Sequence, residues 1–381
     1  SIPFIAIYFS GELDMSMTEI GIFFGAMAIV RSLFQAVGGE LSDRMDRRDL
    51  LIVSQFARSL AFVVMGLAVA FDWGFWPIAL GMTFNSIFGA MFMPAINALV
   101  SDILPKVQRL DGYAITRAAG NFGWAAGPAM GGFFAHNSYA TLFYISAVIT
   151  AMSAVVFLLF FKSPTQTTPS RAFSFRDLAE VRKDSYLARH CLLTLALYLV
   201  VAQLVAPLSV YTVEMVGITE SQLGWLFAIN GAMVTVLQLP VTRLLSRWRF
   251  TSQLAVGGLL YFIGYGVLGL FTQYSVLALL IVVITVGEIT MSPPSMTLTS
   301  RLAPDGRMGR YMGIYGFFMA SGWSLGPMYG GYFLDHYGNQ PELAWLLISS
   351  LAVVSSVGYW LFGRSLPDEI NLADNVSSDN D

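Results

Sequence analysis

Long apolar stretches separated by short polar ones run along nearly the whole chain. Most of them are about 20 residues long, which is the length an α-helix needs to cross the hydrocarbon core of a bilayer. The pattern predicts twelve membrane-spanning helices, of which the first is truncated. Their predicted ranges are 1–10, 19–40, 51–71, 75–99, 113–135, 139–161, 189–212, 222–243, 253–272, 275–299, 309–334 and 343–363.

The composition agrees with lipid as the main solvent. Of 381 residues, 56% are hydrophobic and only 12% are charged, and the mean hydropathy is +0.64. A soluble domain carries about 25% charged residues, so this chain cannot solvate the surface of a soluble protein of its size. One cysteine excludes an internal disulfide, and histidines at 136, 190 and 336 are too scattered to predict a metal site.

The basic residues are confined to alternate connections. They lie at 43–50, 101–112, 162–188, 243–252 and 300–310, whereas the connections between these contain acidic residues and no Lys or Arg. Basic loops face the cytoplasm, so the chain is predicted to be a multi-pass inner (plasma) membrane protein with a cytoplasmic C-terminus. The polar, acidic tail at 364–381 is expected to be disordered.

The second half of the chain repeats the first. Residues 123–132 (Gly-Trp-Ala-Ala-Gly-Pro-Ala-Met-Gly-Gly) recur as 322–331 (Gly-Trp-Ser-Leu-Gly-Pro-Met-Tyr-Gly-Gly), at an offset of 199. An offset of 203 relates Gly21 to Gly224 and Arg44 to Arg247. Each repeat has six spans, an even number, so both repeats begin on the same side of the membrane and are parallel. The predicted fold is therefore an all-α membrane protein of two six-helix halves, 1–161 and 189–363, joined by a cytoplasmic linker at 162–188. Residues 174–186 form either a surface helix or part of a flexible linker.

The connection after the second span has a recognisable pattern. It reads Gly39-Glu-Leu-Ser-Asp-Arg-Met-Asp-Arg-Arg48 and resembles motif A of the major facilitator superfamily, G-x-L-x-D-R-x-G-R-R, with Asp46 where the family has Gly. The span count, orientation and repeat extend this resemblance over the whole chain. The resemblance implies alternating access, with a cytoplasmic gate formed by Gly39, Asp43, Arg44 and Arg48. Asp43 would face a helix start near Gly309 in the other half; the alternative is that these charges only set the topology.

Two further motifs lie in the fourth and fifth spans. Gly123, Gly127 and Gly131 recur every four residues and leave one helix face bare for close approach, and Pro128 bends or loosens that helix. This segment resembles motif C, which is associated with exporting antiporters. The fourth span resembles motif B, but Asn85 stands where the motif has Arg, so the role of that Arg does not carry over.

Glu288 is the acidic residue that lies well inside a predicted span. A charge at this depth costs at least about 2.5–3.5 kcal/mol on insertion scales, so such residues usually have a function. The surrounding segment, Val286 to Pro294, resembles the same span of proton-coupled multidrug antiporters. The resemblance implies proton coupling or cation recognition; a buried structural ion pair is the alternative.

Three arginines also lie within spans. Arg31 lies near mid-membrane, and it either pairs with Glu288 or binds an anionic group of a substrate. Arg117 either lines the cavity between the halves or contacts the cytoplasmic loop. Arg58 is expected to be structural, reaching from near the cytoplasmic end of its helix toward water.

Neutral polar residues inside the spans complete the candidate substrate cavity. Each of them lines the cavity or links helices by hydrogen bonds. They are Gln35, Asn85, Gln203, Asn230 and Gln238.

The sequence therefore predicts a secondary transporter that exports amphipathic or lipophilic small molecules in exchange for protons. The alternative is a carrier of a lipid, a sugar or an anionic metabolite, with Arg31 binding the anion. The nucleotide-binding, hydrolase and metalloprotease signatures are absent from the sequence, so an enzyme is not expected. The expected partners are a small-molecule substrate and the bilayer, without nucleic acid, cofactor or metal, and the expected oligomeric state is a monomer.

Overall fold

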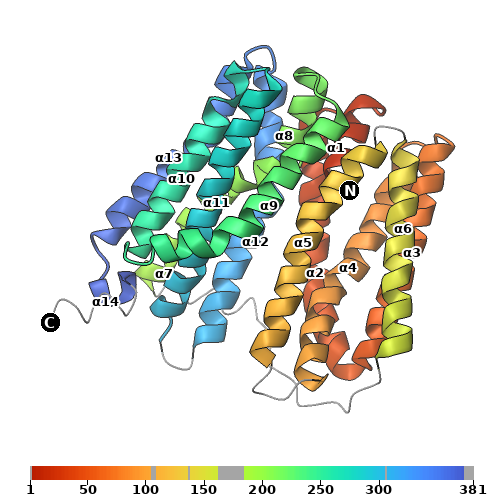
Figure 1. Ribbon diagram of the computed structural model, residues 1–381, viewed down its shortest axis with the longest axis horizontal. Coiled ribbons are helices and arrows are strands. Elements are labelled where there is room, and N and C mark those ends of the chain that lie inside the picture. Colours follow the sequence, from red (N-terminus) through yellow and green to blue (C-terminus); the bar gives the residue numbers. More distant parts are fainter. Residues whose placement is uncertain (1, 104–108, 136–137, 162–183, 305–306, 373–381) are drawn as a thin grey trace. The chain divides into compact units, whose positions relative to one another are not determined.

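The computed structural model describes residues 2–103, 109–135, 138–161, 184–304 and 307–372 (Figure 1). Every regular element in these ranges is helical. Eight of the described helices are long and apolar enough to cross a membrane. The predicted all-α membrane fold is confirmed at this level, whereas the count of twelve spans in two repeats stays a prediction.

The main helices coincide with the predicted spans and extend several of them by one turn or more. They are α1 (Ile2–Gly11), α2 (Met17–Arg44), α3 (Arg47–Ala70), α4 (Phe75–Ile103), α5 (Arg109–Ala135), α6 (Tyr139–Phe160), α7 (Ser185–Val201), α9 (Glu220–Leu244), α10 (Phe250–Gly266), α11 (Tyr274–Leu302), α12 (Met308–Tyr337) and α13 (Pro341–Gly363).

The seventh span differs from its prediction at both ends. It begins at Ser185, where the Asp184 carboxylate caps the first turn, so the predicted linker is too long at its C-terminal end. After Val201 the regular helix gives way to a 3₁₀ turn, η3 (Ala202–Leu204), a short helix, α8 (Pro207–Val210), and a π turn, η4 (Tyr211–Met215). Pro207 explains the break because it has no N–H to continue the helical hydrogen bonds. The surface helix considered for 174–186 lies almost wholly outside the described residues.

The chain divides into two compact units. Unit 1 comprises residues 1–14, 26–172 and 219–225, and unit 2 comprises residues 15–25, 173–218 and 226–381. The units thus depart from chain order at two points. The start of α2 belongs to unit 2, and the start of α9 belongs to unit 1.

Unit 1 is built around α3, which packs against α4 and α6 (Figure 1). Leu51, Ala95 and Phe157 belong to a buried apolar cluster between these helices. The Asp46 carboxylate accepts a hydrogen bond from the Arg48 backbone N–H at 2.9 Å and so caps the start of α3. This capping gives a physical reason for the residue that departs from motif A, because Asp is a preferred N-cap residue.

Unit 2 packs α10 between α11 and α13, and packs α7 against α12 and α13. The C-terminal segment after α13 contains a short helix, α14 (Asp368–Asn371). Asn371 is fully buried, and its Oδ1 accepts from the Thr251 backbone N–H at 3.0 Å, which caps the start of α10. The prediction of a disordered tail is therefore wrong for residues 364–372. The sequence predicts disorder here because the tail is polar. The polar side chain of Asn371 is buried, however, and caps another helix.

The sequence offsets recur in the helix positions. The two helices α4 (Phe75–Ile103) and α11 (Tyr274–Leu302) both have 29 residues, and their first residues are related by the offset of 199. In the same way, the first residues of α3 and α10, Arg47 and Phe250, are related by the offset of 203.

Close backbone contacts also recur at repeat-related positions. In unit 2, a side chain at Gly331 would collide with the Met17 carbonyl at the start of α2. In unit 1, a side chain at Gly132 would collide with the Glu220 carbonyl at the start of α9. The offset of 199 relates the two glycines, and the offset of 203 relates Met17 to Glu220. In unit 2 the contact is strengthened by Asp335, whose carboxylate accepts from the Met17 and Thr18 backbone N–H groups at 2.9 and 2.6 Å.

Candidate functional site

Glu288 lies at the midpoint of α11, equally far along the chain from Tyr274 and from Leu302. At about 1.5 Å per residue it is about 21 Å from either helix end. Its side chain is partly exposed, and its Oε2 accepts a hydrogen bond from Asn230 Nδ2 of α9 at 3.0 Å. Asn230 is itself buried and also donates to Thr285 Oγ1 at 3.0 Å. A carboxylate at this depth thus keeps one neutral amide donor in unit 2.

Three buried tyrosines of unit 2 lie within electrostatic range of Glu288. Tyr198, Tyr261 and Tyr265 are all buried and interact electrostatically with its carboxylate. Tyr265 stacks on Trp345 with ring centroids 5.6 Å apart. The Tyr265 hydroxyl and the Trp345 indole N–H are buried without a hydrogen-bond partner among the described atoms. Buried polar groups of this kind are where internal water binds in proteins.

Two of the predicted cavity glutamines link helices in unit 2. Gln203 is fully buried, and its Nε2 donates to the Leu199 carbonyl at 2.6 Å and to the Gly326 carbonyl at 2.8 Å, which ties α7 to α12. Gln238 is partly exposed and donates from α9 to the Ile289 carbonyl of α11 at 3.2 Å. Of the two roles considered for these residues, the structure supports helix linking for Gln203, whereas Gln238 links helices and stays accessible.

Unit 1 carries positive charge in the interior of its helices. Arg58 of α3 donates from Nε to Asn85 Oδ1 and from Nη1 to Gln55 Oε1, each at 3.0 Å. Its guanidinium also lies beside Gly89, where an added Cβ would be 3.5 Å from Nε. A guanidinium is therefore present at the motif B position, although it comes from α3 and not from residue 85. These bonds agree with the structural role expected of Arg58, although they are formed inside the unit and not at the helix end.

Arg31 of α2 has an exposed side chain, and Arg58 repels it electrostatically. Arg31 belongs to unit 1 and Glu288 to unit 2, so their pairing stays a prediction. The side chains of Gln35 and Arg117 lie outside the described part of the structure.

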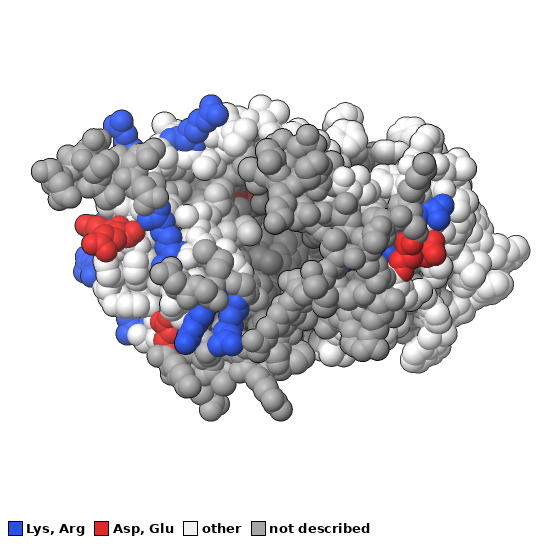
Figure 2. Space-filling view, turned by 90° about the horizontal axis from the view of Figure 1, so that it is seen from below, with Lys and Arg blue, Asp and Glu red and all other residues white. Residues whose placement is uncertain are grey.

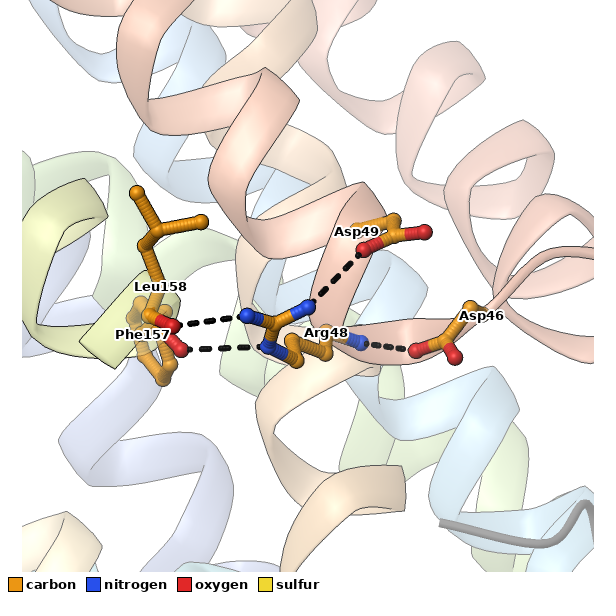
Figure 3. A network of polar contacts seen from close by, with 5 residues as sticks. All are labelled: Asp46, Arg48, Asp49, Phe157 and Leu158. Carbon is orange, nitrogen blue, oxygen red and sulfur yellow. Dashed lines mark hydrogen bonds and ion pairs between the residues drawn. The ribbon is translucent and has the colours of Figure 1, made fainter. Parts of the chain in front are cut away.

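The described part of the predicted gate motif is bonded within unit 1 (Figure 3). Arg48 donates from Nε to the Phe157 carbonyl at 3.3 Å and from Nη2 to the Leu158 carbonyl at 2.6 Å, at the end of α6. A third nitrogen lies 3.5 Å from the Asp49 carboxylate. Cations at a helix C-terminus stabilise its free carbonyl groups. Arg48 thus joins α3 to α6. The surroundings of Gly39 and the side chains of Asp43 and Arg44 lie outside the described part of the structure.

The glycines of motif C differ in their surroundings. At Gly123 and Gly127 an added Cβ would meet no described atom within 4 Å. At Gly131 it would lie 2.6 Å from the Phe4 ring of α1. Pro128, which lies between Gly127 and Gly131 in the sequence, is buried. The predicted close approach is therefore seen at Gly131, and no described atom lies close to the other two glycines.

Arginine side chains mark one end of the helices in each unit. This basic end is defined by Arg47 and Arg48 in unit 1 and by Arg249 and Arg301 in unit 2. Figure 2 shows Lys and Arg side chains on the face seen from below, with Asp and Glu among them. The opposite ends carry Asp72, Glu220, Asp335 and Glu342, and we call them the acidic end.

Curated proteins of similar sequence are membrane transporters. The uncharacterised MFS-type transporter YqjV of Bacillus subtilis is 26% identical over 361 residues, covering 93% of this chain and 87% of that protein. The multidrug resistance protein MdtH of Yersinia enterocolitica is 25% identical over 369 residues, covering 95% and 90%.

Solved transporter structures share the fold. A mutant of the nucleoside transporter NupG aligns with a TM-score of 0.79 at 12% identity, covering 95% of this chain and 94% of that chain. A bacterial homologue of the human lysosomal transporter Spinster, inward-facing and unoccupied, aligns with a TM-score of 0.75 at 14% identity, covering 98% and 94%. The sequence profile described as Major Facilitator Superfamily matches residues 1–327 and 191–377. The chain therefore belongs to the major facilitator superfamily and is a transporter, not an enzyme.

Proposed function

We propose that this chain is a proton-coupled exporter of amphipathic or lipophilic small molecules that works by alternating access. The observation that carries the proposal is Glu288, a carboxylate at the midpoint of an apolar helix with one amide partner, Asn230. An ionised carboxylate is costly at membrane depth and a protonated one is not. The free-energy difference between the ionised and protonated forms is therefore larger at Glu288 than at a carboxylate exposed to water.

The proposal includes twelve spans in two parallel six-helix repeats in the inner membrane. The shared offsets of the helix starts and the repeated glycine contacts support it. The basic end and the C-terminal tail face the cytoplasm, which the positions of Arg249, Arg301 and Arg364 favour. The working unit is a monomer that needs the proton gradient and no bound cofactor. The similarity to MdtH, which is named a multidrug resistance protein, favours export as the direction.

A second candidate function is transport of an anionic substrate. Away from their ends, the predicted spans of the first half contain Arg31, Arg58 and Arg117 and no Asp or Glu. The exposed side chain of Arg31, which Arg58 repels, is the observation that favours this candidate. An anion bound at Arg31 would relieve that repulsion.

Proteoliposome transport under an imposed pH gradient tests the two functions against each other. The probes are a fluorescent lipophilic cation and a fluorescent amphipathic anion. We expect the wild type to accumulate the cation on the acidic side. We expect Glu288→Gln to abolish this accumulation, because the amide cannot exchange a proton. Glu342→Gln, the same change in the first turn of α13, is the matched control and should behave as the wild type.

The outcomes separate the candidates. Gradient-driven transport that survives in Glu288→Gln would refute the coupling role of this residue. Accumulation of the anion alone, lost in Arg31→Gln, would establish the second function instead.

A further inference from the structure

A second buried polar cluster lies in unit 2 between Glu288 and the basic end. Its centre is His190 of α7, which is fully buried. His190 Nε2 lies 2.9 Å from Thr299 Oγ1 and 3.2 Å from the Ser295 carbonyl oxygen, both on α11. His190 Nδ1 lies 3.1 Å from the Tyr359 hydroxyl of α13. The imidazole is thus held at both nitrogens by groups from two other helices.

Hydroxyl groups connect this cluster to the surroundings of Glu288. The Tyr315 hydroxyl of α12 donates to Ser295 Oγ at 2.9 Å and also interacts electrostatically with Tyr198. Tyr198 in turn interacts electrostatically with Glu288. Ser295 follows Glu288 by seven residues on α11, so it lies on the same helix face about 10.5 Å closer to the basic end.

The cluster occupies the second turn of α7. His190 is five residues after Ser185, so it lies about 7.5 Å along the axis from the start of the helix. Its ring stacks on Tyr315, with centroids 5.5 Å apart and an interplanar angle of 4°. In the orientation proposed above, the histidine stands between the mid-membrane carboxylate and the cytoplasm.

We propose that His190 is a second proton site of the transporter, which takes the proton that Glu288 releases and delivers it to the cytoplasm. The inference rests on the proposed proton coupling. The Glu288 carboxyl loses a proton to Tyr198 through one water molecule, because no direct hydrogen bond joins these two described side chains. The hydroxyls of Tyr198, Tyr315 and Ser295 then each accept one proton and pass on their own. The last proton binds to a nitrogen of His190 and leaves it for water at the start of α7. The step between Ser295 and Thr299, one helical turn apart, requires a side-chain rotation or one water molecule.

The hydrogen bonds around His190 suit both of its protonation states. In the neutral ring, Nδ1–H donates to the Tyr359 hydroxyl and Nε2 accepts from the Thr299 hydroxyl. In the charged ring, Nε2–H donates to Thr299 Oγ1, whose hydroxyl hydrogen turns to the Ser295 carbonyl oxygen, 2.9 Å away. No donor faces another donor in either state, so the cluster can take up and release a proton without leaving a buried group unpaired.

The other titratable groups near His190 come from the helices packed around it. Tyr315 and Tyr359 contact its ring from α12 and α13. On its own helix stand Cys191, which is buried, and Asp184, whose carboxylate caps α7 and accepts from the Tyr311 hydroxyl at 2.7 Å. On α11 the nearest acid is Glu288, two turns away. Asp184 is therefore the carboxylate that follows His190 toward the basic end.

The experiment compares two transport modes in proteoliposomes with the fluorescent lipophilic cation as probe. Net transport driven by a pH gradient requires proton release, whereas counterflow at equal pH exchanges substrate for substrate. The variants are His190→Gln, which keeps one amide donor, and Tyr359→Phe, which removes only the hydroxyl. His336→Gln is the matched control, because this histidine is exposed near the acidic end of α12.

We expect both variants to lower gradient-driven transport at least about tenfold, since a positioned acid–base group contributes that much or more. Counterflow and the KM for the probe should stay within about twofold of the wild type, because substrate binding is untouched. Wild-type gradient-driven transport in His190→Gln would overturn the inference. An equal loss of both modes would also overturn it, since that marks a structural role. Wild-type transport that does not depend on the pH gradient would refute the proposed function itself.

Discussion

Positions related by the internal repeat differ in charge between the two units. In unit 2, Glu288 of α11 lies near Tyr261 of α10 and accepts from Asn230. In unit 1, the offset of 199 places Gly89 at the equivalent position, and Gly89 lies beside the Arg58 guanidinium of α3. The offset of 203 makes Arg58 itself the equivalent of Tyr261. The position of the carboxylate in unit 2 is thus taken in unit 1 by a glycine with a guanidinium from the neighbouring helix beside it.

This difference indicates separate tasks for the two units. The described interior of unit 2 holds tyrosines, a histidine and one carboxylate, which are groups that transfer protons. Unit 1 holds fixed positive charge, which an Arg keeps at any physiological pH. Proton coupling belongs to unit 2 in our account, and the positive charge of unit 1 favours anionic groups, as in the second candidate function.

The largest expected effect tests the guanidinium of unit 1. Arg58→Met leaves Asn85 Oδ1 and Gln55 Oε1 without their donor, and Gln55 is buried, where an unpaired polar group costs about 1–3 kcal/mol. We expect a large drop in the thermal midpoint of the purified protein. The double exchange Arg58→Asn with Asn85→Arg should recover part of the loss, because it restores the bond from the opposite helix. Equal midpoints for the wild type and Arg58→Met would contradict the described bonds.

The next effect compares equivalent glycines in α5 and α12. Gly326 of α12 faces α7 and η3, where an added Cβ would lie 2.5 Å from the Ala202 Cβ, whereas an added Cβ at Gly127 of α5 would meet no described atom within 4 Å. Gly326→Ala should cost about 1–3 kcal/mol by overpacking. Gly127→Ala should be neutral or stabilise by up to about 1 kcal/mol, because Ala favours helix. Thermal unfolding of both variants measures the contrast, and equal destabilisation would show that both glycines are closely packed.

The smallest effect compares two helix caps. The helix α3 is capped by the residue before it, Asp46, whereas the equivalent helix α10 is capped from the distant tail by Asn371. Asn371→Ala should cost about 1 kcal/mol, and Asp46→Gly only a few tenths, because Gly is tolerated at an N-cap. Limited proteolysis should also release the tail in Asn371→Ala. A tail that stays protected in this variant would show that α14 is held by other contacts.

The sequence predicts the long helices well because an apolar run of about 20 residues admits few structures in lipid. It fails where polarity has a local use, as in the ordered tail around Asn371 and the broken end of the seventh span at Pro207. Glu288 could be singled out from the sequence alone because it lies far from both ends of a predicted apolar span. Its partner Asn230 could not, because contacts between helices depend on helix rotation, which the hydrophobic pattern leaves open.

Arg58 shows the same limit in unit 1. Its position suggested a side chain reaching the helix end, yet it lies about three turns into α3 and bonds to Asn85 on the neighbouring helix. The substitution of the motif B arginine by Asn85 was visible in the sequence. That another helix supplies the guanidinium was visible only in the structure.

The most direct test of proton coupling through Glu288 is proton flux measured with a pH-sensitive dye trapped inside proteoliposomes. A gradient of the fluorescent lipophilic cation is imposed with no initial pH gradient. The account predicts that the wild type and Glu342→Gln move protons against the cation, and that Glu288→Gln moves the cation without protons or not at all. A wild-type proton flux in Glu288→Gln would contradict it.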